Sequence, residues 1–218
     1  SGIRHSTGDI HPRRQAEISE GLKVLIENQT IPETLRAKLG YRFDQPRWEE
    51  IGEQEIEEFL PFLEDEEKKR ILFTIRMQRL TEFALKVLRF GRVNEEEIVS
   101  NLGKEKWDCV QKTAPSERDY RILGEVMNEQ HALLRDLYDV SLPKIEDICS
   151  VALEAGAYGA KISGAGTGGS IIALVKDEES GRKVVDACVS IGAKNAWVSK
   201  VGAGVEVESS DQILPTQL

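Results

Sequence analysis

A glycine-rich stretch near the C-terminal end contains the residues of this chain most suited to chemistry. Residues 161–170 read Lys-Ile-Ser-Gly-Ala-Gly-Thr-Gly-Gly-Ser, and an apolar run follows over 171–175. Few Cβ atoms shield the backbone of such a loop, so its N–H groups can approach an anion closely. The composition indicates a loop that lies against phosphate. The alternative is a plain glycine-rich turn between two strands.

Two familiar phosphate-binding motifs do not fit this loop. Gly164, Gly166 and Gly169 have the G-x-G-x-x-G spacing, but the dinucleotide-binding fingerprint needs a helix after the loop. The run that begins at Ser170 is rich in strand-forming residues and predicts a strand instead. The loop also lacks the Gly-Lys-Ser/Thr ending of a P-loop. Neither motif therefore describes it.

Helices are predicted for most of the chain before the loop. The strongest runs from Asp65 to Phe90 with a broad apolar face, and Gly91 ends it. The pattern changes at Gly156, after which short strands flank the loop. Helices first and strands last predict an α+β fold. We expect a helix-rich N-terminal two-thirds packed with a small, mainly antiparallel sheet near the C-terminus.

One domain is expected over residues 1–218. After the loop, the pattern predicts a helix over 177–191 and further strands over 196–201 and 204–207. The expected parts are an opening segment (1–12), a mainly helical region (13–155), the glycine loop with a βαβ unit (156–208) and a polar tail (209–218).

Composition excludes several classes of function. The net charge of −9 argues against a general binder of nucleic acid or membrane surfaces. The longest apolar runs are too short to span a bilayer. The three cysteines are widely spaced and odd in number, which is typical of reduced thiols in an intracellular protein and not of a metal site. We expect a cytoplasmic protein without a metal site of its own.

Three segments closely resemble the galactokinases. They are residues 124–143, which include Asn-Glu-Gln-His and Arg-Asp-Leu-Tyr, the glycine stretch 156–169, and Ser-Gly-Ile-Arg-His-Ser at 1–6 with the paired arginines at 13–14. Together they identify a relative of the galacto-, homoserine, mevalonate and phosphomevalonate kinases, and they match the C-terminal half of a galactokinase. The stretch 94–117 looks like an insertion.

The resemblance implies a role for the glycine loop beside the phosphates of ATP. The residues that match this motif are Ser163, Gly164, Ala165, Gly166, Thr167, Gly168 and Gly169. Galactokinases usually have glycine at position 165, phenylalanine at 167 and cysteine at 170, where this chain has alanine, threonine and serine. The form Ser-Gly-Ala-Gly at 163–166 is closer to other members of the superfamily than to galactokinases.

Three other residues receive roles from the same resemblance. Arg4 matches an arginine near the transferred phosphate, although it also fits a solvated terminal side chain. His11 lies where galactokinases have a sugar-contacting tyrosine, with the segment one residue short, so a plain surface histidine is its alternative. His131 is expected to pack its helix near the loop and not to act in catalysis.

The first two motifs of the family, its catalytic aspartate and its magnesium ligands are missing from these residues. ATP and Mg²⁺ are therefore expected mainly from an N-terminal kinase domain that would be the partner of this chain, with a small sugar as substrate. The chain alone should be inactive. The surface that faces the missing half would be exposed and apolar, which favours association into a homodimer.

Two alternatives stay open at this point. The chain could come from a kinase of the same superfamily with another sugar or a mevalonate-type substrate. It could also come from a non-catalytic, galactokinase-like sensor that binds a partner protein.

Overall fold

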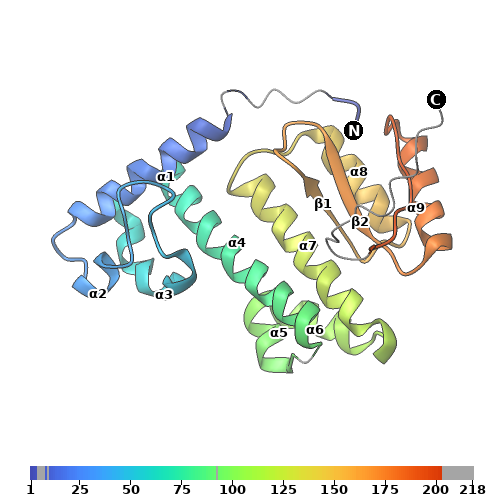
Figure 1. Ribbon diagram of the computed structural model, residues 1–218, viewed down its shortest axis with the longest axis horizontal. Helices are drawn as coiled ribbons and strands as arrows, with labels where there is room; N and C mark the ends of the chain where they lie inside the picture. The colour runs from blue at the N-terminus through green and yellow to red at the C-terminus, as the bar shows by residue number, and fades with distance from the viewer. Residues whose placement is uncertain (4–7, 9, 92, 203–218) are drawn as a thin grey trace, which may run out of the picture.

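The computed structural model describes residues 1–3, 8, 10–91 and 93–202, and it consists mainly of helices with one β-hairpin (Figure 1). The α+β prediction is confirmed. Short 3₁₀ turns occupy Trp48–Glu50, Glu57–Phe62 and Pro115–Glu117. The elements in chain order are α1 (Ile10–Glu27), α2 (Glu33–Arg36), α3 (Glu53–Ile56), α4 (Asp65–Phe90), α5 (Glu95–Leu102), α6 (Lys104–Gln111), α7 (Arg118–Asp136), α8 (Pro143–Glu154), β1 (Gly159–Ser163), β2 (Ser170–Leu174) and α9 (Glu178–Ser190).

The long helix α4 runs from the side of the molecule that α1, α2 and α3 form to helices α5 and α6 (Figure 1). A capping box starts it, in which Glu64 precedes the first turn and the Glu67 side chain accepts from the Glu64 N–H at 3.0 Å. Gly91 ends it in the left-handed conformation, φ +58°, and donates its N–H to Val87. The predicted bounds of this helix are confirmed.

Three apolar cores lie along the molecule. The first forms between α1, α3 and the N-terminal half of α4, and the second between the C-terminal half of α4 and helices α5, α6 and α7. The third lies between the hairpin, α8 and α9. Since α4 and α7 pack against each other, these two helices join the first core to the hairpin.

The hairpin is antiparallel and lies beside α7. Gly159 of β1 pairs with Leu174 of β2, and the register continues to Ser163 opposite Ser170. A Cβ atom on Gly124 of α7 would lie 2.4 Å from the carbonyl carbon and oxygen of Tyr158. Helix and strand therefore approach so closely that only glycine fits at this crossing.

Two parts of the prediction differ from the structure. Residues 196–201 are not a strand, since they form no backbone ladder with β2 among the described residues, and the described part of the βαβ unit ends with α9 and coil. The predicted strand over 204–207 lies outside the described residues. Helix α6, inside the stretch taken for an insertion, was not predicted; it buries Trp107 and Val110 in the second core.

Among the described residues, no helix combines the length and the apolar composition that a bilayer crossing needs.

The close contact between α7 and β1 predicts that a glycine-to-alanine substitution destabilises the fold at Gly124 but not at Gly21. Gly124→Ala should lower the free energy of unfolding by about 1–3 kcal/mol, because the methyl group meets rigid backbone. Gly21→Ala in α1 is the control: its nearest neighbours are side-chain atoms at 3.2 and 3.3 Å, and alanine favours a helix by about 1 kcal/mol. Urea denaturation measures both variants. Equal changes would contradict the assigned crossing.

Candidate functional site

The glycine loop is the turn of the β1–β2 hairpin, as the strand after it predicted. Its backbone is left-handed at four glycines and at one threonine. The φ angles are +93° at Gly164, +78° at Gly166, +54° at Thr167, +129° at Gly168 and +74° at Gly169. Glycine adopts positive φ values without strain, whereas they cost a β-branched residue such as threonine about 1–3 kcal/mol. The loop is therefore held in one shape by its surroundings.

The segment after α7 supplies one of the supports that hold the loop. The Thr167 N–H donates to the Val140 carbonyl oxygen at 2.7 Å. Gly166 packs directly on the same residue, since a Cβ atom there would lie 2.7 Å from both the Cβ and the oxygen of Val140. Val140 itself is buried. The middle of the loop thus rests on a single valine.

The N-terminal residues support the end of the loop (Figure 1). Gly169 donates its N–H to the Ile3 carbonyl oxygen at 3.0 Å, and the Ser1 hydroxyl donates to the Gly169 carbonyl oxygen at 2.8 Å. Arg4, the predicted phosphate-contacting arginine, lies outside the described residues.

His11 is brought to the loop by the first turn of α1. Its Nε2 lies 3.0 Å from the Ala165 carbonyl oxygen, and because a carbonyl only accepts, this nitrogen carries the proton. The ring is tilted against Tyr138, with centroids 6.2 Å apart. The structure thus places two of the predicted site groups together. A contact between His11 and a sugar stays a prediction.

Several N–H groups of the loop are available for a ligand. Within the described part of the chain, the N–H groups of Gly164, Ala165 and Gly168 donate to no acceptor. Unpaired backbone donors in a loop of left-handed residues can bind an anion. The loop sequence from Ser163 to Ser170 contains no lysine or arginine, so its contribution to binding would come from the backbone.

Side chains of helix α7 accept hydrogen bonds from backbone N–H groups of β1, as a neighbouring strand would. Asn128 Oδ1 accepts the Ala160 N–H at 3.0 Å, and His131 Nδ1 accepts the Ile162 N–H at 3.4 Å. Lys161 Nζ donates to Gln130 Oε1 at 2.8 Å. The prediction that His131 packs its helix near the loop is confirmed. The roles of Asn128 and Gln130 were missed, although both belong to the same Asn-Glu-Gln-His motif.

Comparison with known proteins places this site in a family. Residues 110–194 match the family model described as GHMP kinases C terminal. This match contains α7, the hairpin and the glycine loop. These residues are therefore similar to the C-terminal part of the GHMP kinases. The galactokinase of Pyrococcus furiosus is 37% identical over 90 residues, and that of Saccharomyces cerevisiae is 42% identical over 62 residues.

A solved structure, Lactococcus lactis galactokinase complexed with galactose, shares the fold of nearly the whole chain. The match covers 94% of this chain with a TM-score of 0.60 and 22% sequence identity. It covers 44% of that protein. The sequence matches span 25% of the Pyrococcus relative and 12% of the yeast relative, and 41% and 28% of this chain. The chain therefore corresponds to only part of these galactokinases.

No group of three or more His, Cys, Asp or Glu side chains gathers among the described residues in a way that could hold a metal ion.

Burial and a neighbouring carboxylate have opposite effects on the pKa of His131, the buried histidine beside β1. His131 Nε2 lies 3.0 Å from Glu146 Oε1. Arg135 Nη1 and the Ser141 hydroxyl hold the Glu146 carboxylate. Burial lowers the pKa of His131 below its ordinary value of 6.5, despite the nearby carboxylate. The neutral ring therefore keeps Nδ1 free to accept the Ile162 N–H.

This environment predicts a loss of stability in mild acid. Below pH 6.5 the unfolded chain binds a proton at His131 before the folded chain does, so stability falls with pH until the folded pKa is reached. His131→Asn should remove this slope, because asparagine offers Oδ1 to Ile162 without a titrating group. Denaturation as a function of pH measures it. The slope below about pH 5, which arises from carboxylates, serves as control. An unchanged slope between pH 7 and 5 would contradict the assignment.

Proposed function

We propose that this chain supplies the phosphate-facing loop of an ATP-dependent, galactokinase-like sugar kinase. The observation that carries the proposal is a loop held at positive φ values in which the N–H groups of Gly164, Ala165 and Gly168 donate to no acceptor among the described residues. Phosphoryl transfer needs donors that are positioned in advance around the phosphates. The kinship with galactokinases supports the choice of reaction.

The parent enzyme would move the γ-phosphoryl group of ATP to the anomeric hydroxyl of a galactose-like sugar. Residues 163–169 would position the phosphates, and Arg4 would offset the charge that develops during transfer. His11, next to Ala165, would contact the sugar. The catalytic carboxylate, the second phosphate loop and the Mg²⁺ ligands would belong to an N-terminal domain. Such an enzyme would act in the cytoplasm.

The purified 218-residue chain is expected to be inactive. A loop that positions phosphates cannot activate a hydroxyl without a base and a metal ion. Incubation with ATP and galactose should give no galactose 1-phosphate above background, as measured by coupled ADP release. Turnover by the chain alone would overturn this division of roles.

The full-length gene product tests the proposal itself. Reading the gene upstream of Ser1 should reveal a Gly-Leu-Gly-Ser-Ser loop and a catalytic aspartate; a start codon directly before Ser1 would contradict the proposal. In the full-length enzyme, Gly168→Ala should lower kcat/KM for ATP by at least about tenfold, because φ +129° excludes alanine. Gly192→Ala, at φ +92° in the turn after α9, carries similar strain away from the loop and should leave kcat/KM unchanged.

Thr167 and Ser170 favour a second candidate, a kinase of the same superfamily with a different substrate. Both stand where galactokinases usually have larger or different side chains. A panel of sugars and mevalonate assayed with the full-length enzyme distinguishes the two. A protein that binds sugar and nucleotide without turnover would instead be a sensor.

A further inference from the structure

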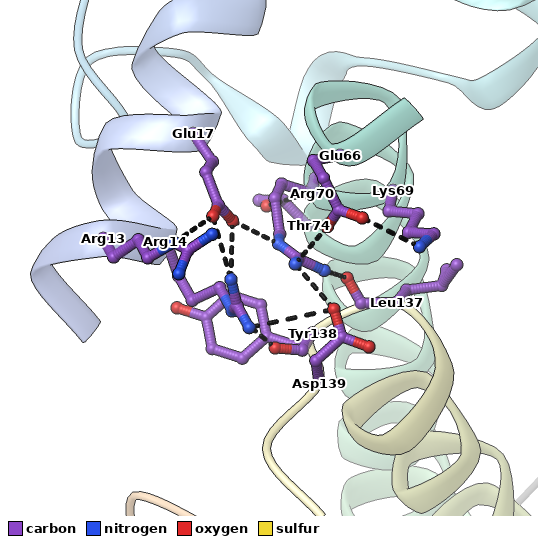
Figure 2. Close-up of polar contacts among 10 residues, drawn as sticks. All are labelled: Arg13, Arg14, Glu17, Glu66, Lys69, Arg70, Thr74, Leu137, Tyr138 and Asp139. Atoms are coloured by element: carbon purple, nitrogen blue, oxygen red, sulfur yellow. Dashed lines mark hydrogen bonds and ion pairs between the residues drawn. The ribbon is translucent and has the colours of Figure 1, made fainter. Parts of the chain in front are cut away.

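The guanidinium group of Arg70 is the charged group buried most deeply among the described residues. The side chain lies on α4 and is 0% exposed. Figure 2 shows that its nitrogens reach three elements of the chain. Nε donates to Glu17 of α1 at 2.7 Å, and Nη2 donates to Glu66 of α4 and to Asp139, both at 2.6 Å. Nη1 donates to the Leu137 carbonyl oxygen. Every nitrogen of the group therefore has an acceptor.

Arg14 extends this cluster along the same segment. Its Nη1 donates to both oxygens of Glu17 at 2.9 Å, and its Nε donates to the Tyr138 carbonyl oxygen at 2.8 Å. Two arginines thus hold three consecutive residues, Leu137, Tyr138 and Asp139 (Figure 2). We call these residues, with Arg14, Glu17, Glu66 and Arg70, the Arg70 cluster.

The two arginines of the cluster are paired with carboxylates by direct contact. Burial alone would raise the pKa of Glu17, but hydrogen bonds from Arg70 and Arg14 outweigh burial and lower it. Glu17 therefore stays ionised at neutral pH and keeps both arginines in place.

The residue that follows the cluster is Val140, which supports the glycine loop. Asp139 has a left-handed backbone, φ +51°, and this turn directs Val140 toward the loop. The Val140 carbonyl oxygen accepts the Thr167 N–H, and its side chain lies against Gly166. A continuous path of direct contacts thus runs from Arg70 through residues 137–140 to the loop.

The loop needs such a support because its conformation is strained. Thr167 is β-branched and sits at φ +54°, a region that such residues avoid unless neighbouring contacts fix them. The backbone N–H of Thr167 donates to the Val140 carbonyl oxygen at 2.7 Å, and this hydrogen bond helps to fix its φ. If Val140 moved, Thr167 would relax toward an ordinary φ and the N–H group of Gly168 beside it would change direction.

We propose that Arg70 is a positioning residue of the glycine loop, acting through Leu137, Asp139 and Val140. The effect on loop shape is a property of this chain. Its consequence for phosphoryl transfer rests on the proposed function.

The test is amide hydrogen exchange at Thr167, measured by NMR on the 218-residue chain without nucleotide. Arg70→Gln should accelerate exchange at this amide about ten- to hundredfold relative to amides of α4, because hydrogen bonds to charged groups are lost. Asp139→Asn keeps the size of the side chain and tolerates a positive φ. It should accelerate the same exchange about three- to tenfold, since the negative charge that pairs with Arg70 is lost from a half-exposed position. This variant carries the test if Arg70→Gln does not fold.

Arg76→Gln is the matched control. Arg76 lies on the same helix and donates from Nε to Glu53 at 3.0 Å, which holds α3 and not the loop. Its removal should destabilise the fold without changing Thr167 exchange relative to α4. If Asp139→Asn leaves Thr167 as protected as Arg76→Gln does, the positioning role is overturned. If exchange accelerates as expected but the full-length protein shows no kinase activity, the positioning role stands and the proposed function fails.

Discussion

A buried guanidinium group must have acceptors for its N–H donors. In this molecule, that requirement brings together α1, α4 and the segment after α7. Arg70 has no contact with solvent, and removing one partner from a buried pair costs about 3–5 kcal/mol. Its acceptors lie 53 residues before it on α1 and up to 69 residues after it. Helix α1, helix α4 and the segment after α7 must therefore meet at one point. The same segment continues directly into the valine that supports the glycine loop, so the loop depends on this meeting.

A second constraint fixes the loop from the other side. Among the described residues, β1 pairs with a strand on one edge only, that of β2, and α7 lies along its other edge at a distance that only glycine permits at position 124. At that distance the side chains of Asn128 and His131 replace the hydrogen bonds of a missing strand. Since these bonds end at Ile162, one residue before Ser163, they fix the point from which the loop leaves the sheet. The loop is thus held at its start by α7 and in its middle by Val140.

The features that sequence could predict are those with a local cause. The bounds of α4 follow from its apolar face and from Gly91, and the hairpin follows from a glycine loop before a run of strand-forming residues. The Arg70 cluster has no local cause, because Lys68, Lys69 and Arg70 look alike in sequence and only tertiary structure buries the third. Residues 196–201 read as a strand from their apolar residues, yet a strand also needs a partner edge, which sequence pattern does not supply. The proximity of His11 to the loop came from the family resemblance and not from any pattern in the residues.

The chemistry of the loop also explains why this chain would be one half of a site. Residues 163–170 bring backbone donors and no cationic side chain, and the chain carries a net charge of −9. Under the proposed function, a triphosphate at the loop would meet oriented dipoles but no cationic side chain of residues 163–170, and dipoles alone do not offset the charges of ATP. Under the proposed function, the neutralising charge must come from Arg4, from Mg²⁺ and from cationic groups of the other domain. The contribution of this loop would then come from its fixed geometry. Thr167 is strained and is held through the Arg70 cluster, so the N–H donors beside it keep their direction. Donors that are already in position need no reorganisation when phosphate binds.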